Sequence, residues 1–134
     1  MELFINGLAN VLQPYCLVLM IVGTIIGIIF GAIPGLSSVM AIALFLPMTY
    51  GMDPAIAMGL LLALYIGSVS GGLISAILLK IPGTPSSVAT CFDGHPMLEH
   101  GEGIKALGTG VVFSFLGTIF SVVVLIFLAP QIAK

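Results

Sequence analysis

Three long apolar runs with almost no charge constrain this chain more than any other feature of its sequence. They cover residues 15–33, 54–79 and 104–129, and Lys105 is the only charged side chain within them. About 20 consecutive apolar residues in a helix cross a hydrocarbon core of about 30 Å. Because a helix pairs its backbone groups internally, it is the form that such a run takes in lipid. The sequence therefore predicts an all-α fold of several transmembrane helices.

The overall composition also indicates a membrane protein, and it argues against a soluble domain and a nucleic-acid-binding protein. Charged residues make up 6% of the 134 residues and apolar residues 60%, whereas a soluble domain has about 25% charged residues. The three basic residues, Lys80, Lys105 and Lys134, are far apart in the sequence, which excludes the clustered basic face that nucleic acid requires. Cys16 and Cys91 lack the spacing of a zinc site or a redox motif.

Pro34-Gly35 interrupts the apolar sequence between the first run and a shorter one at residues 36–50. A single helix over residues 15–50 would be about 54 Å long, nearly twice the hydrocarbon core. We therefore expect a hairpin that turns at Pro34-Gly35 and either crosses the membrane again or re-enters from the same side. Asp53 and Pro54 then suit the N-cap and the first position of the next helix.

Most of the polar side chains lie in residues 80–103, between the last two long runs. We expect an aqueous loop here, with Glu102 in the first turn of the following helix. Its two histidines, His95 and His100, are separated by four residues that include a proline. This spacing fits no metal-ligand pattern, and no nucleophile–base pair indicates an enzyme. Lys80 and Lys105 flank the loop, so the excess of positive charge predicts that it faces the cytoplasm.

Small residues recur at every fourth position in each long run, so they line one face of each helix. Such ridges let helix backbones approach closely in lipid, and we expect these spans to pack against one another. The ridges comprise Gly23, Gly27, Gly31 and Gly35; Gly59, Ala63, Gly67, Gly71 and Ser75; and Ala106, Gly110, Ser114 and Thr118.

Two Pro-Gly breaks echo each other along the chain. Residues 23–35 read GTIIGIIFGAIPG and residues 71–83 read GGLISAILLKIPG, and a pair of serines follows each. Where a helix breaks inside a membrane, free carbonyls suit a small cation, and free amides with nearby hydroxyls suit an anion. The alternative is a kinked packing helix followed by an interfacial loop. The candidate substrate- or ion-binding residues are Pro34, Gly35, Ser37, Ser38, Pro82, Gly83, Thr84, Pro85, Ser86, Ser87 and Thr90.

Both breaks lie in stretches that resemble a known family. GTIIGIIFGAIPGLSSVMAIALFLPMTY resembles the GxxxGxxPG signature of the permease subunit of tripartite tricarboxylate transporters. YIGSVSGGLISAILLKIPGTPSSVATCFDGHPMLEHGEGIKALG resembles that family's segment with IPGTP followed by DG-x-PM. The similarity covers about residues 20–110, and Ser37 stands where members often have glycine.

The resemblance implies a large, multi-pass permease of the bacterial inner membrane, built from two inverted repeats, of which residues 1–134 would be the N-terminal portion. It also implies ion-gradient-driven uptake of a carboxylate such as citrate, together with a periplasmic solute-binding protein and a small membrane subunit. The alternative is a structural membrane subunit that packs through its glycine faces and binds nothing.

We expect no catalytic residues, no resident metal and no cofactor other than sodium as a coupling ion. Proton coupling usually relies on carboxylates or histidines within the membrane. Between Tyr15 and Leu79 the only carboxylate is that of Asp53, which belongs to a turn. Backbone carbonyls and hydroxyls at the two breaks are oxygen ligands suited to Na⁺.

Overall fold

The structure, a computed structural model, describes residues 2–132, and every regular element in that range is a helix. This confirms the all-α fold. Three of the helices, α2, α4 and α6, are long and apolar enough to cross a membrane, which supports a multi-pass protein. The elements are α1 (Glu2–Val11), α2 (Pro14–Ala32), α3 (Ser38–Phe45), the 3-10 helix η1 (Leu46–Gly51), α4 (Pro54–Leu79), the 3-10 helix η2 (Pro85–Ser87), α5 (Val88–Glu99) and α6 (Gly103–Ile132).

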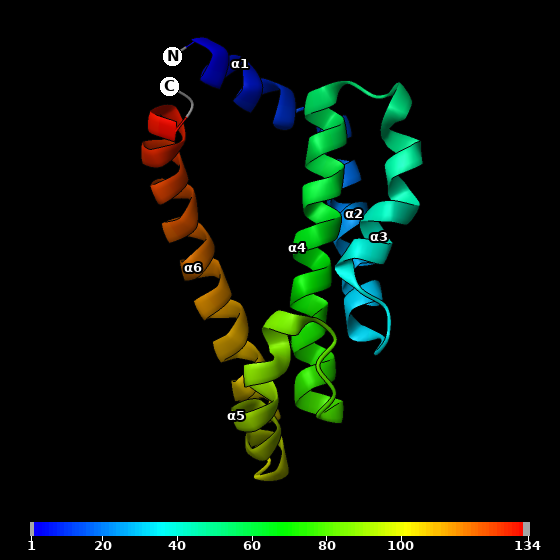
Figure 1. The fold of residues 1–134 in the computed structure, drawn as a ribbon, viewed down its shortest axis with the longest axis vertical. Coiled ribbons are helices and arrows are strands. Elements are labelled where there is room, and N and C mark those ends of the chain that lie inside the picture. Colours follow the sequence, from blue (N-terminus) through cyan, green and yellow to red (C-terminus); the bar gives the residue numbers. More distant parts are fainter. Residues whose placement is uncertain (1, 133–134) are drawn as a thin grey trace.

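The chain reverses direction at the first Pro-Gly break, as the sequence predicts. Helix α2 ends at Ala32, and Gly35 has a φ of +93°, a conformation that few residues other than glycine adopt. Ser37 then caps α3 by accepting a hydrogen bond from the Met40 amide at 3.3 Å. The return limb, α3 followed by η1, runs back to the end of the molecule at which α2 begins (Figure 1). The hairpin thus has one long and one short limb.

Helices α2 and α4 pack along their glycine ridges, with backbone against backbone. A methyl group on Gly27 would lie 2.9 Å from the Ser68 amide nitrogen, and one on Gly71 would lie 2.9 Å from the Ala32 amide nitrogen. Neither neighbour is a flexible side chain, so no larger residue fits without moving a helix. The predicted close packing is confirmed for this pair of helices.

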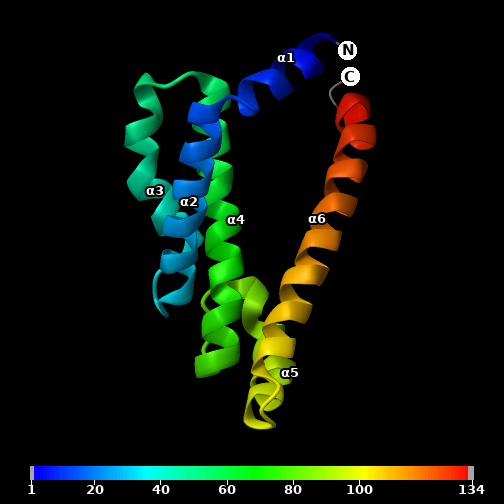
Figure 2. The same ribbon diagram turned by 180° about the vertical axis from the view of Figure 1, so that it is seen from behind.

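The small-residue ridge on α6 is less buried than the ridges on α2 and α4. Ala106 is buried and Gly110 half-buried, but Ser114 and Thr118 are exposed. Helix α6 starts beside α5 and the lower end of α4 and then leans away from the bundle (Figures 1 and 2). The prediction that this ridge packs against the other spans therefore holds only at its N-terminal end, where Gly110 lies beside Leu73 of α4.

The segment 80–103 contains η2 and α5 where the sequence predicts a loop; its exposure to water stays a prediction. Lys80 ends α4 with a φ of +56°, and the chain then turns back along α4, so that Thr84 lies against Gly72. After η2 reverses the direction again, α5 leads down to α6 (Figure 1). Thr84, Ser87 and Cys91 are buried. Residues 81–99 therefore form a hairpin, which we call the re-entrant hairpin because its first limb turns back along α4. The Thr84 and Ser87 side chains are buried and bond to each other, whereas Ser86, Asp93 and Glu99 are exposed.

Candidate functional site

The two breaks place their candidate residues in different surroundings. At the first break, Pro34 and Gly35 are exposed, Ser37 and Ser38 are half-buried, and the Ser37 hydroxyl is used as a helix cap. At the second break, Gly83 and Thr90 are half-buried, and the remaining residues divide into two groups. Thr84 and Ser87 are buried, whereas Pro82, Pro85 and Ser86 are exposed.

Hydrogen bonds within the second break fix the positions of its hydroxyls. The Ser87 hydroxyl accepts from the Thr84 amide at 3.2 Å and donates to the Thr84 carbonyl at 2.8 Å. The Thr84 and Ser86 hydroxyls lie 3.0 Å apart. Pro85 occupies the first position of η2, where no amide hydrogen is needed. The result is a small rigid cluster of oxygens, of which Ser86 is the exposed member.

The second break also contacts the end of α2 that leads into the first break. A methyl group on Gly83 would collide with the Gly31 carbonyl and would lie 2.5 Å from the Ser75 hydroxyl. Gly31 belongs to the last turn of α2, and the Phe30 carbonyl has no helical partner because Pro34 lacks an amide hydrogen. Carbonyls at this helix end therefore lie beside the second break. Among the described residues, no hydrogen bond joins the serines of the first break to the hydroxyls of the second.

A groove between α4, the re-entrant hairpin and α6 brings several hydroxyls together. It consists of two adjoining cavities of about 440 and 330 Å³ that share Val69, Ser86 and Ser114 in their walls. We call it the hydroxyl groove after its polar lining, which comprises Ser70, Ser86, Ser87, Thr90, Ser114 and Thr118. No charged side chain lines either cavity.

Three of the groove hydroxyls were not predicted as site residues. Ser114 and Thr118 were recognised only as members of a small-residue ridge, and Ser70 was not singled out. Their signal in the sequence is the spacing of Ser114 and Thr118, which places two hydroxyls on one face of an otherwise apolar helix. Such a pair is also typical of ordinary helix packing in membranes, so the spacing alone does not separate the two uses.

Ser68 is a further polar residue that sequence reasoning missed. It lies on α4 against Gly27 and Gly31 of α2, is fully buried, and its hydroxyl has no hydrogen-bond partner. By contrast, the Ser75 hydroxyl about two turns further along α4 donates to the Gly72 carbonyl at 3.2 Å. An unpaired buried hydroxyl costs about 1–3 kcal/mol. Ser68 thus offers a free oxygen beside the last turns of α2.

The charged groups of the described residues lie away from the hydroxyl groove. Asp53 caps α4 through the Ala55 amide at 2.9 Å, and Lys105 pairs with Glu102 at the start of α6. In the part of the chain that the structure describes, no cluster of three or more His, Cys, Asp or Glu residues could hold a metal ion. A ligand in the groove would therefore be bound by hydroxyls, backbone amides and carbonyls.

Broken helices that bring hydroxyls and free backbone groups together within a multi-pass membrane protein are characteristic of secondary-transporter permeases. The chain matches the tripartite tricarboxylate transporter TctA family over residues 17–134. It belongs to this family.

A relative from Agrobacterium vitis is named "uncharacterized 52.8 kDa protein in TAR-I ttuC' 3' region". It is 33% identical over 128 residues, which cover 96% of this chain and 26% of the relative. The chain thus spans about a quarter of the length of this relative. No solved structure matches the chain.

Proposed function

We propose that this chain forms part of a permease that takes up a small carboxylate, such as a tricarboxylate, across the bacterial inner membrane. The observation that carries the proposal is the hydroxyl groove, which the second Pro-Gly break supplies with Ser86, Ser87 and Thr90. The family membership supports transport as the activity. The word "tripartite" in the family's name supports two further components, which we propose are a periplasmic solute-binding protein and a small membrane subunit.

Carboxylate oxygens accept hydrogen bonds, and the Ser86 and Thr90 hydroxyls of the groove can donate to such a group. The Ser87 and Thr118 hydroxyls already donate to backbone carbonyls. The hydroxyls of Ser86 and Thr90 lie where η2 leads into α5. The Val88 amide at the start of α5 already donates to the Pro85 carbonyl, so hydroxyls are the donors that remain here. The positive end of the helix dipole favours negative charge at the same place. A carboxylate bound here would need no lysine or arginine, and none lines the groove.

We propose sodium as the coupling ion, bound where α2 ends against α4. Carbonyls of the last turn of α2 and the unpaired Ser68 hydroxyl supply hard oxygen ligands at this place. Sodium binding by unwound backbone and helix C-termini is a recurring device in secondary transporters. A cation at this position would also give the Ser68 hydroxyl the partner that it lacks within the protein.

Uptake by the complete permease with its partner subunits in proteoliposomes tests both parts. Labelled citrate uptake is measured with an imposed Na⁺ gradient and, separately, with an imposed proton gradient in sodium-free buffer. We expect uptake only with sodium, and a loss of at least tenfold for Ser86→Ala combined with Thr90→Val. Full uptake without sodium would reject the sodium site. Unchanged uptake by the double variant would reject the groove as the carboxylate site.

A structural subunit that binds nothing is the competing function, and the tight glycine packing of α2 against α4 is the observation in its favour. This packing explains the glycine ridges without any ligand. It leaves the hydroxyl groove and the unpaired Ser68 hydroxyl without a role. Uptake of labelled citrate in vesicles, with and without substitution at Gly83, separates the two functions, because a merely structural subunit tolerates any change that leaves the complex assembled.

A further inference from the structure

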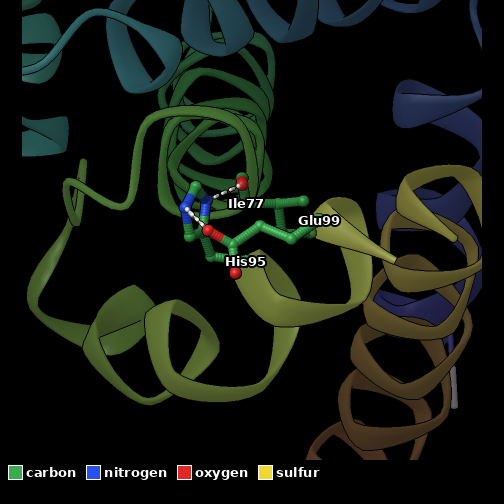
Figure 3. Close-up of polar contacts among 3 residues, drawn as sticks. All are labelled: Ile77, His95 and Glu99. Atoms are coloured by element: carbon green, nitrogen blue, oxygen red, sulfur yellow. Dashed lines mark hydrogen bonds and ion pairs between the residues drawn. The ribbon is translucent and has the colours of Figure 1, made fainter. Parts of the chain in front are cut away.

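His95 joins the re-entrant hairpin to the end of α4. Its Nδ1 atom lies 2.9 Å from the Ile77 carbonyl oxygen of α4, and its Nε2 atom lies 3.6 Å from a carboxylate oxygen of Glu99 (Figure 3). The His95 side chain is 19% exposed and that of Glu99 is 67% exposed. The imidazole is therefore held between a backbone acceptor on one helix and a carboxylate on its own helix.

The Ile77 carbonyl determines which ring nitrogen carries the proton of the neutral histidine. Helix α4 ends at Leu79, and Lys80 adopts a left-handed conformation, so this carbonyl lies in the last turn, where helical donors run out. A carbonyl can only accept a hydrogen bond, so Nδ1 must carry a hydrogen. In the neutral ring, Nε2 then presents a lone pair to the Glu99 carboxylate, which is also an acceptor.

Protonation changes this contact from unfavourable to favourable without moving the ring. When Nε2 gains a proton, Nδ1 still donates to Ile77, and Nε2 forms an ion pair with Glu99. The positive ring also lies at the C-terminal end of α4, where the helix dipole favours cations. Histidine is the side chain that changes charge between about pH 5 and 8. We propose that His95 is a pH-sensitive latch, which holds the re-entrant hairpin more tightly against α4 when it is protonated.

Other charged groups near this end of the molecule do not replace Glu99 as the partner. They are Lys80 at the end of α4, Asp93 and His100 on or next to α5, and Glu102 and Lys105 at α6. Lys105 pairs with Glu102. Among the described residues, Glu99 is the one charged group at ion-pair distance from the His95 ring.

The latch acts on a part of the chain that carries candidate site residues. Close packing couples the two helices, since a methyl group on Gly94 of α5 would lie 2.7 Å from a side-chain carbon of Ile77. Ser86, Ser87 and Thr90 belong to the same hairpin as His95 and line the hydroxyl groove. If the latch loosens, these hydroxyls move with the hairpin. The resulting control of transport by pH rests on the proposed function, whereas the latch itself does not.

The accessibility of Cys91 measures the latch without any transport assay. Cys91 lies on α5, is 8% exposed and directs its thiol toward the Ser87 carbonyl at 3.6 Å. Labelling by N-ethylmaleimide is followed in membranes that contain the full permease, with Cys16→Ala as the background. Because maleimide reacts with the thiolate, each rate is divided by that of His95→Gln at the same pH, which removes the intrinsic pH dependence of the thiol.

We expect this ratio to be roughly two- to fivefold lower at pH 5.5 than at pH 8. Glu99→Gln removes the carboxylate but keeps the Nδ1 bond and the attraction of the positive ring to the C-terminal end of α4, so its ratio should change with pH by less than that of the unsubstituted chain. A ratio that is the same at both pH values in the unsubstituted chain would overturn the proposal. A pH dependence in Glu99→Gln that is as large as that of the unsubstituted chain would also overturn it. Neither of these results bears on the proposed carboxylate site in the hydroxyl groove. A failed uptake assay, by contrast, would count against that site and not against the latch.

Discussion

Replacing Gly83 with alanine tests whether close contact at the second break is essential. The added methyl group would collide with the Gly31 carbonyl, and it would lie 2.5 Å from the Ser75 hydroxyl and 3.0 Å from the Gly72 Cα atom. Two of these neighbours are backbone atoms of α2 and α4, which cannot rotate away as a side chain can. Overpacking of this kind costs about 1–3 kcal/mol, so we expect the hairpin to move away from α4.

The consequence for function follows from that free energy. A cost of about 1–3 kcal/mol changes the ratio of docked to displaced hairpin by about 5- to 150-fold. We expect uptake of labelled citrate by the Gly83→Ala permease to fall to a fifth or less, while the protein still inserts into the membrane. Its thermal unfolding in detergent should begin several degrees lower, because the displaced hairpin no longer covers α4.

Gly108→Ala is the matched control, because it adds the same methyl group where there is space. Gly108 lies on an exposed part of α6, and no atom lies within 4 Å of the added carbon. Alanine is also favoured over glycine in a helix by about 1 kcal/mol, so this variant should keep its uptake and its stability. Wild-type uptake and thermal stability in Gly83→Ala would refute the conclusion that the second break requires this contact.

Substitutions at three further positions test other parts of the molecule. Gly35 has a φ of +93° and open space around it, so a substitution there is limited by backbone strain and not by contact. Asparagine tolerates positive φ better than valine, so Gly35→Asn should retain uptake, whereas Gly35→Val should lose it through a backbone strain of about 1–3 kcal/mol. Ser68→Ala removes the unpaired hydroxyl, so the protein should melt no lower, while the Na⁺ concentration for half-maximal uptake rises. His100→Cys provides an exposed thiol near Lys80 and Lys105, and a membrane-impermeant maleimide should not label it from outside intact cells; strong labelling would reverse the predicted orientation.

The parts of the fold that the sequence predicts well are those fixed by local pattern. A glycine at every fourth position forms one continuous face, and in lipid such a face packs best against another of the same kind, which is how α2 and α4 meet. The turn at Pro34-Gly35 follows from the missing amide hydrogen and the positive φ. Neither feature requires knowledge of distant parts of the chain.

The re-entrant hairpin could not be predicted from local pattern, because its burial depends on tertiary contacts. Residues 81–99 are polar enough to suit water. The bonds between Thr84 and Ser87 are a local capping box, but this pattern does not indicate that Thr84 packs against Gly72 of α4. Position 83 has no room for a side chain, because the Gly31 carbonyl and the Gly72 Cα atom lie directly opposite it. The same limit applies to Ser68, whose lack of a partner is visible only once α2 is packed against α4.

Helix α6 indicates why a ridge of small residues has two uses in this protein. On α2 and α4 the small residues let two backbones touch. On α6 the same spacing leaves Ser114 and Thr118 facing a cavity, because the helix leans away from α4 beyond its N-terminal turns (Figure 2). Large side chains at these two positions would fill the hydroxyl groove. Small hydroxyl residues on a diverging helix keep the groove open and supply polar groups to its wall, which packing alone would not require.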